Sequence, residues 1–312
     1  MDARIMWPAL RPSRRATVLI AALSLASVVA ACQGPGSSAG SPAAGGLKVV
    51  TTTTVFADIV RNIGGDRVAV SSIIPAGVGP EDYEPKPDDA KLLSDAELII
   101  SNGVGLDDFL DDLLASGSGG SAPRLVLGEG VPTVTEDGEE NPHLWLDPSI
   151  VRESYVPNVA ATLAEVDPAG KATFDSAAAS YSAALDALDA ELKSKVEAVP
   201  EANRKLVTFH DAFPYFARHF GFELVGVILQ NPGQEPTAAE LAALVDQVKA
   251  AGAKAVFSEA QFSPKLAETL AQEAGITNVV TTLYNDSLGP PPADTYIGLM
   301  HWDVDQIVAA LK

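Results

Sequence analysis

The sequence predicts an α/β protein with two lobes, each a parallel sheet flanked by helices, joined by one long helix. Short β-branched runs alternate with helical patterns from residue 47 to the end of the chain. This alternation is typical of βαβ units rather than of a β-sandwich or a helical bundle. Residues 167–200 break the alternation because they keep a helical period throughout, and a helix of that length can run along both lobes.

A secretory signal is predicted for residues 1–31. The first 15 residues carry four arginines and one acidic residue, and an uncharged run, Ala16–Ala31, follows them. A basic stretch followed by a short apolar stretch and small residues is the order found in export signals. Because the run is shorter than the roughly 20 residues that a membrane-spanning helix needs, we expect it to direct export and to be removed.

Cys32 is the only cysteine of the chain and directly follows these small residues. It resembles the cysteine of bacterial lipoprotein signals, which is lipidated and becomes the new N-terminus. A lone cysteine cannot form an intramolecular disulfide, but a buried free thiol, or cleavage without lipidation, would also fit. Residues 32–46 are rich in Gly, Ser, Ala and Pro, so we expect a flexible tether between the lipid and the folded part.

The charge of the exported chain limits its partners. Without residues 1–31 it has 17 basic and 40 acidic residues, a net charge of −23. A field of this sign repels nucleic acid and anionic lipid headgroups and concentrates cations. Solubility alone would account for most of these charges equally well, but nucleic acid is not expected as a partner.

The strands and helices are predicted in order from their residue patterns. A helix over residues 106–114 has apolar side chains at three- and four-residue spacing. Thr237 and Glu240 form a capping box ahead of a helix that Gly252 ends. The predicted strands are the short β-branched runs, which lie at residues 47–54, 68–74, 98–101, 205–209, 224–227, 255–258 and 278–283.

The long helix divides the chain. At 1.5 Å per residue it would span roughly 45 Å. We therefore predict an N-terminal lobe at residues 47–166, a linking helix at residues 167–200 and a C-terminal lobe at residues 201–312. The apolar residues that mark its buried face are Phe174, Tyr181, Leu185, Leu188, Leu192 and Val196.

Four polar residues lie where ligands bind in open parallel sheets, beyond the carboxyl ends of the strands. Glu81 follows the strand that ends at residue 74, His210 ends the strand KLVTFH, and Asp286 follows the last strand. His143 lies in the segment NPHLWLDP. Two of the four come from each predicted lobe, so they would converge only in a cleft between the lobes.

Two imidazoles and two carboxylates are a suitable ligand set for a first-row divalent metal ion. Affinity should fall steeply below about pH 6, because imidazoles with an ordinary pKa near 6.5 take up protons there. Asp82 or Glu84 could supply the oxygen in place of Glu81 after a small shift of the loop. Glu259, just past a strand, is a further candidate and is more readily explained as a support behind the ligands.

The two remaining histidines are interpreted differently. His219 lies nine residues beyond His210, and in a helical segment it would face roughly the opposite way. His301 has no acidic or histidine partner in a matching motif. We expect both to be surface or hydrogen-bonded residues rather than ligands.

Four motifs together resemble one known family. They are PEDYEPKPDD, NPHLWLDP, VTFHDAFPYFARHFG and FSEAQFSPKLAETLAQEAG. Residues 47–312 are similar to the zinc and manganese solute-binding proteins of ABC transporters, a family with two α/β lobes joined by one long rigid helix. The resemblance implies a metal site between the lobes, with Zn²⁺ or Mn²⁺ as the transported ligand and no organic cofactor. It also implies a monomer outside the cytoplasm, anchored to the cell membrane through Cys32, that serves an ABC permease with its ATPase.

The resemblance also assigns individual positions. His143 matches the family's histidine in the PH segment, and Asp286 matches the aspartate after the last strand. His210 matches a position that is His in zinc-type members and Glu in manganese-type members. Glu81 departs from the pattern, because the family usually has His in a DPHxYEP loop.

The number of oxygen atoms that each carboxylate contributes decides which metal ion the site suits. With one oxygen from each, the site is four-coordinate and suits zinc; with two from each, it is six-coordinate and suits manganese. We favour zinc, with manganese next, although the histidine-rich loop of many zinc carriers is absent and residues 134–140 are merely acidic.

Two other classes of protein compete with this interpretation. In a zinc-dependent hydrolase, His143, His210 and Asp286 would hold the ion and Glu81 would act as general base. That reaction needs an open coordination position and room for a substrate, and the chain has no HExxH or nucleophile motif, so we do not expect an enzyme. A binder of an organic solute, or an adhesion protein, would leave the four residues without a purpose.

Overall fold

The computed structural model describes residues 45–80, 83–115, 120–136, 138–229 and 235–312. The predicted signal at residues 1–31, Cys32 and all but the end of the predicted tether lie outside these residues. None of the helices in the described ranges has both the length and the apolar character needed to cross a membrane.

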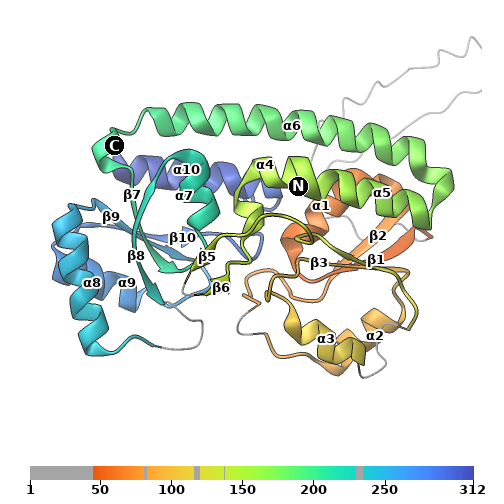
Figure 1. Ribbon diagram of the computed structural model, residues 1–312, viewed down its shortest axis with the longest axis horizontal. Helices are drawn as coiled ribbons and strands as arrows, with labels where there is room; N and C mark the ends of the chain where they lie inside the picture. The colour runs from red at the N-terminus through yellow and green to blue at the C-terminus, as the bar shows by residue number, and fades with distance from the viewer. Residues whose placement is uncertain (1–44, 81–82, 116–119, 137, 230–234) are drawn as a thin grey trace, which may run out of the picture. The chain divides into compact units, whose positions relative to one another are not determined.

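The N-terminal lobe contains one parallel sheet (Figure 1). Its strands are β1 (Leu47–Thr51), β2 (Val68–Ser72), β3 (Leu98–Ser101) and β4 (Arg124–Val126), in the order β2-β1-β3-β4. The first three occupy predicted strands. The fourth was not predicted, because it is three residues long and begins with an exposed arginine.

The strands of the C-terminal lobe form two parallel pairs. β7 (Lys205–His210) pairs with β8 (Glu223–Leu229), and β9 (Ala255–Glu259) pairs with β10 (Asn278–Leu283). β7 also contacts β9, so the two pairs lie together. A short antiparallel hairpin, β5 (Thr135–Glu136) and β6 (Glu139–Glu140), precedes the segment that carries His143.

The long helix is α6 (Lys171–Glu197), preceded by a 3-10 turn at Pro168–Gly170. It is therefore shorter at both ends than residues 167–200, and it spans about 40 Å at 1.5 Å per residue. Its buried residues are the six predicted from their spacing. The predicted α/β class, with two lobes and a long helix, is confirmed, while the residue boundaries of the lobes stay a prediction.

A layer of helices covers one face of the N-terminal sheet and one face of the two adjacent strand pairs of the C-terminal lobe, which together are called the C-terminal sheet. α6 packs against α1 (Thr54–Gly64), α5 (Val156–Val166) and α10 (Tyr296–Leu311), and Figure 1 shows it running along both lobes. The largest hydrophobic core lies beneath this layer and contains strand residues of both lobes, such as Val49 and Leu206. The layer therefore binds the two sheets into one framework.

The opposite face of each sheet has its own core. Val50, next to Val49, faces α2 (Pro87–Ser94) and α3 (Asp108–Ala115). Val207, next to Leu206, faces α8 (Ala238–Ala251) and α9 (Lys265–Ala274). Because neighbouring strand residues point to opposite faces, each strand is fixed from both sides, and so are the loops at its carboxyl end.

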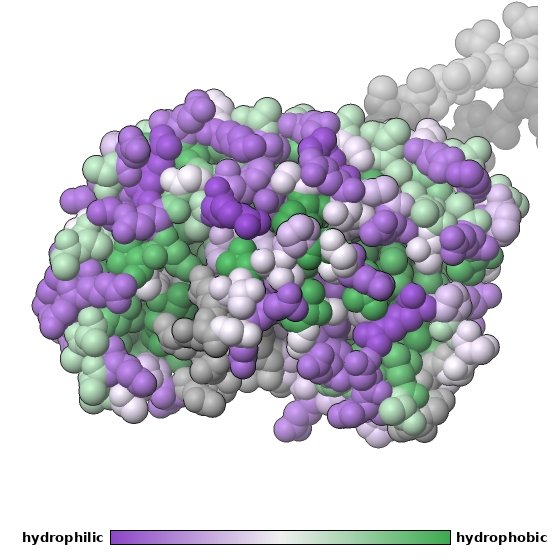
Figure 2. Space-filling model, in the orientation of Figure 1, coloured by the Kyte–Doolittle hydropathy of each residue, from purple (hydrophilic) through white to green (hydrophobic). Residues whose placement is uncertain are grey.

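Two short helices complete the framework near the strand ends. α4 (Pro148–Ile150) continues into a π-helical turn at Val151–Tyr155, and α7 (Pro214–Phe220) follows β7. On the face seen in Figure 2, hydrophilic side chains are spread widely rather than gathered into one patch.

Candidate metal site

The segment NPHLWLDP holds His143 at the edge of the core. Leu144, Trp145 and Leu146 are fully buried in a 3-10 turn directly after it. The Trp145 indole donates to the carbonyl of Asn285 at 2.8 Å, which connects this segment to the loop that carries Asp286. The His143 side chain is consequently buried, with 4% of its surface exposed.

His210 and Asp286 come from neighbouring strand ends of the C-terminal lobe. His210 is the last residue of β7, and Asp286 follows the end of β10 by three residues. Carboxyl ends of parallel strands meet at one edge of a sheet, and both side chains are almost completely buried there, at 2% and 0% exposure.

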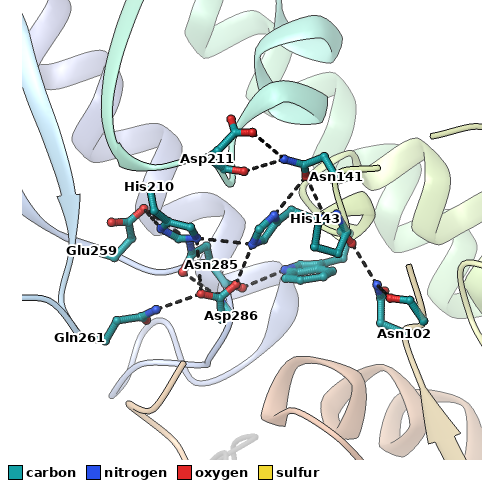
Figure 3. A network of polar contacts seen from close by, with 12 residues as sticks. Asn102, Asn141, His143, His210, Asp211, Glu259, Gln261, Asn285 and Asp286 are labelled. Carbon is teal, nitrogen blue, oxygen red and sulfur yellow. Dashed lines mark hydrogen bonds and ion pairs between the residues drawn. The ribbon is translucent and has the colours of Figure 1, made fainter. Parts of the chain in front are cut away.

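The structure brings these three predicted residues together (Figure 3). The Nε2 atoms of His143 and His210 lie 3.4 Å apart. Asp286 Oδ1 lies 3.3 Å from His143 Nε2, and Asp286 Oδ2 lies 3.7 Å from His210 Nε2. Two ligands bound at 2.0–2.1 Å to a tetrahedral ion are about 3.4 Å apart. The spacing is therefore that of three ligands around one ion.

A polar contact on the far side of each ring orients the two imidazoles. His143 Nδ1 lies 3.0 Å from Asn141 Oδ1, which also accepts from the His143 backbone N–H. His210 Nδ1 lies 3.0 Å from Glu259 Oε1. Because both partners are acceptors, each ring that binds an ion as a neutral ligand would keep its proton on Nδ1 and turn the lone pair of Nε2 toward the centre.

The charge of Asp286 completes the centre. Burial would raise the pKa of this carboxyl, but the hydrogen bond from His143, the charges of His143 and His210, and a hydrogen bond from Gln261 hold it below its ordinary value. Gln261 Nε2 donates to Asp286 Oδ2 at 2.9 Å. An ionised carboxylate beside two imidazoles, which can exchange their Nε2 protons for an ion, favours a cation between them.

The other candidates from the sequence have different outcomes. Glu81 and Asp82 lie outside the described residues. Glu84 is exposed, and among the described residues it is not part of the group that could hold an ion. Glu259 contacts His210 on the nitrogen that faces away from the centre, so it lies behind the His210 ring and not among the converging donors.

Three amides around the site were missed from the sequence. Asn141 donates to the backbone carbonyl of Asp211 at 2.6 Å, which joins the segments that follow β6 and β7. Asn285 Nδ2 lies 3.2 Å from His210 Nε2, and Gln261 supports Asp286. Each lies beside a predicted residue or within a quoted motif, and that proximity is the only signal that the sequence offers for them.

The loop that carries Asp286 is tied to the N-terminal lobe. Ser287 Oγ accepts from the Gly77 backbone N–H at 2.7 Å, and Thr54 Oγ1 accepts from the Leu288 N–H at 2.9 Å. Gly77 lies on the chain that leads to Glu81. These bonds hold the loop of Asp286 against the other lobe.

Comparison with known proteins places the chain in a family. The family described as zinc-uptake complex component A, periplasmic, matches residues 49–310. The manganese-binding lipoprotein MntA of Halalkalibacterium halodurans is 32% identical over 273 residues, which cover 86% of this chain and 89% of that one. The iron ABC transporter substrate-binding lipoprotein MtsA of Streptococcus pyogenes is 28% identical over 312 residues, covering 96% and 99%.

The fold is also similar to that of a solved structure of a metal-binding protein. The periplasmic zinc-binding protein TroA of Treponema pallidum matches with a TM-score of 0.78 and 29% identity, covering 86% of this chain and 99% of that one. Since the family match spans nearly the whole folded part of the sequence, this chain belongs to the family of the periplasmic zinc-uptake component A.

Proposed function

We propose that this chain binds one divalent transition-metal ion outside the cytoplasm and delivers it to the permease of an ABC importer, which works with its ATPase. The observation that carries the proposal is the convergence of three buried donor groups within 4.8 Å of one another. Glu81 is proposed as the fourth ligand. The names of the relatives support the class of cargo, since they refer to zinc, manganese and iron.

Zinc is the proposed cargo, with manganese next. Two imidazole nitrogens at 3.4 Å fit the spacing of a tetrahedral zinc site. At sites of nitrogen and oxygen ligands, zinc also binds more tightly than manganese. Elemental analysis of protein purified without added metal, followed by competition between the two ions, tests this choice. Preferential retention of manganese would reject zinc as the cargo.

The central test is calorimetric titration of the metal-stripped protein. His143→Ala and His210→Ala should each weaken zinc binding by about 100-fold or more, because losing only the hydrogen-bonded partner of a ligand typically costs 10–100-fold. His301→Ala is the matched control, since His301 is partly exposed, its Nδ1 lies 3.7 Å from Glu191 Oε1, and it is outside the group of converging donors. Wild-type affinity in either ligand variant would show that the ion binds elsewhere.

We propose capture rather than catalysis. A hydrolytic zinc site needs an open position and room for a substrate, whereas His143, His210 and Asp286 are all buried. Ester and amide substrates offered to the zinc-loaded protein should not turn over. Turnover that is lost in a Glu81→Gln variant would favour the alternative, a hydrolase with Glu81 as general base.

Attachment to the membrane is proposed through a lipid on Cys32, with residues 32–46 as the tether of a monomer. Replacing Cys32 by Ala should move the exported protein from the membrane fraction to the soluble fraction. Mass spectrometry of the wild-type N-terminus should find the lipid, and light scattering of the folded part should give the mass of a monomer. A soluble wild-type protein would contradict the anchor.

Release is proposed to occur through local motion of the loop around Glu81 or the loop of Asp286. The two sheets share a helical layer and one core, so a large rotation of the lobes would disrupt packing. Hydrogen exchange with and without metal should change in these loops and leave α6 protected. Changes along the whole of α6 would instead indicate a hinge motion of the lobes.

A further inference from the structure

His219 occupies an unusual position between two carboxylates. It lies on α7, and only 10% of its side chain is exposed. Its Nδ1 is 3.0 Å from Asp147 Oδ1 and its Nε2 is 2.5 Å from Asp189 Oδ1. From the sequence, His219 was expected only to be a surface or hydrogen-bonded residue.

The His219 ring can donate a hydrogen bond to both carboxylates only when it is charged. A neutral imidazole has one N–H, whereas ionised carboxylates only accept hydrogen bonds. With an acceptor at each nitrogen, the His219 ring carries both protons and a positive charge. The rings of His219 and Phe220 pack in a T-shaped arrangement, with their centroids 4.8 Å apart.

The groups around His219 come from three other elements. Asp147 precedes α4, and Asp189 lies on α6 with Lys193, whose Nζ is 2.8 Å from Asp189 Oδ2. From α10, the Tyr296 phenol interacts electrostatically with both carboxylates and donates its own hydrogen bond to the carbonyl of Trp145. Lys193 is the one cation with a contact to either carboxylate besides His219 in the described ranges.

The two carboxylates connect His219 to the metal site. Asp147 follows His143 by four residues and caps α4 by accepting from the Ser149 N–H at 2.9 Å. His219 itself is on the helix that follows His210. One ring therefore joins the segment of His143, the segment of His210 and α6.

We propose that His219 is a positioning residue of the metal site, which as an imidazolium fixes the separation of the two histidine-bearing segments and locks them to α6. This inference rests on the proposed metal-binding function. An ion bound at 2.0–2.1 Å requires its ligands to be placed within about 0.5 Å. Segments that are already fixed in the metal-free protein lower the ordering cost of binding.

The stabilisation by the ion pairs of His219 with Asp147 and Asp189, called the His219 tie, depends on pH in a defined direction. Burial lowers the pKa of His219, but the hydrogen bonds and charges of Asp147 and Asp189 outweigh it and raise the pKa above the ordinary value. A raised pKa means that the stabilisation is complete below the unfolded value of about 6.5 and is lost as the pH rises through the folded value. The ion pairs of His219 therefore persist to higher pH than those of an ordinary histidine and are lost at alkaline pH.

The first experiment uses the metal-free protein, so it does not depend on cargo. Thermal unfolding of wild type and His219→Gln is compared from pH 6 to pH 9.5, with His301→Gln as the matched control. The variant should unfold several degrees lower near pH 6.5, the gap should narrow at alkaline pH, and His301→Gln should follow wild type. A gap that is the same at every pH would overturn the proposal.

A milder variant keeps the test decisive if His219→Gln fails to fold. Asp189→Asn removes one of the two charges beside the His219 ring and keeps the shape of the side chain at position 189. The pKa of His219, measured by NMR titration, should therefore be lower in this variant. The alkaline loss of stability should move to lower pH with it. A His219 resonance that titrates at or below pH 6.5 in wild type would also overturn the proposal.

The second experiment measures zinc affinity at pH 7. His219→Gln and Asp189→Asn should weaken binding about threefold to tenfold, less than the 10–100-fold typical of direct partners of ligands, and His301→Gln should not. If wild type binds no metal, the proposed function fails while the unfolding experiment still tests the tie. If wild type binds and both variants bind equally well, the proposed function stands and the positioning role fails.

Discussion

Replacing Glu259 by Gln should weaken metal binding without weakening the metal-free fold. The Glu259 side chain is completely buried, and its Oε1 is 3.0 Å from His210 Nδ1. Glutamine keeps an acceptor at that place and removes only the charge. Burial raises the pKa of Asp303, and the charge of Glu259 raises it further, so that charge disfavours the ionised form of Asp303.

The size of the effect follows from the role of the residue. Partners of metal-bound histidines contribute 10–100-fold in affinity, which is about 1.4–2.7 kcal/mol. At saturating zinc the same free energy is lost from the stability of the bound protein. For a chain of this size that lowers the zinc-bound Tm by about 3–10 °C, while the metal-free Tm should stay the same or rise.

The assay is differential scanning calorimetry with and without zinc, combined with a zinc titration. Glu223→Gln is the matched control, because Glu223 is an exposed residue at the start of β8 in the same lobe. If Glu259→Gln lowers both melting temperatures equally, Glu259 is a general packing residue and its support of His210 is refuted.

Three further predictions concern the same framework. Ser287→Ala removes the hydrogen bond from Gly77. Stopped-flow measurement of zinc release into a chelator should therefore give a rate about twofold to tenfold higher. An unchanged rate would mean that the bond does not hold the Asp286 loop. Burial raises the pKa of Asp58 to about 6, so protonation favours the folded state and the free energy of unfolding falls as the pH rises through 6. Asp58→Asn should therefore add about 3 kcal/mol to the free energy of unfolding at pH 8 and little at pH 4. An equal gain at both pH values would contradict this. Zinc affinity should fall as the pH is lowered, because imidazole ligands must give up protons to bind the ion; an affinity that does not change with pH would argue against imidazole ligands.

The sequence was most informative where burial is periodic. All six predicted apolar residues of α6 are buried, because a helix repeats the same face every three or four residues. β4 escaped prediction because three partly buried residues carry no period. The end of a predicted strand can also be read from the sequence. This is why His210 and Asp286, which lie at or just after strand ends, could be predicted to lie close together.

The supports of the site could not be predicted as readily. The roles of Asn141 and Asn285 depend on which amide atom lies about 3 Å from an imidazole nitrogen, and no spacing rule carries that information. The same holds for His219, whose partners are 72 and 30 positions away in the chain. Glu81 stays a prediction that rests on its loop and on the family resemblance.

The arrangement of the ties bears on how cargo leaves. An ion held by buried ligands on cross-linked segments dissociates slowly unless a tie is broken, since affinity differences reside mainly in the dissociation rate. The ties behind His143 and His210 are buried and out of reach of a docking protein. Gly77 is exposed, yet its N–H holds Ser287 beside Asp286. We therefore propose that a partner that displaces the Gly77 loop frees Asp286 first, so that the ion leaves while both imidazoles are still in place.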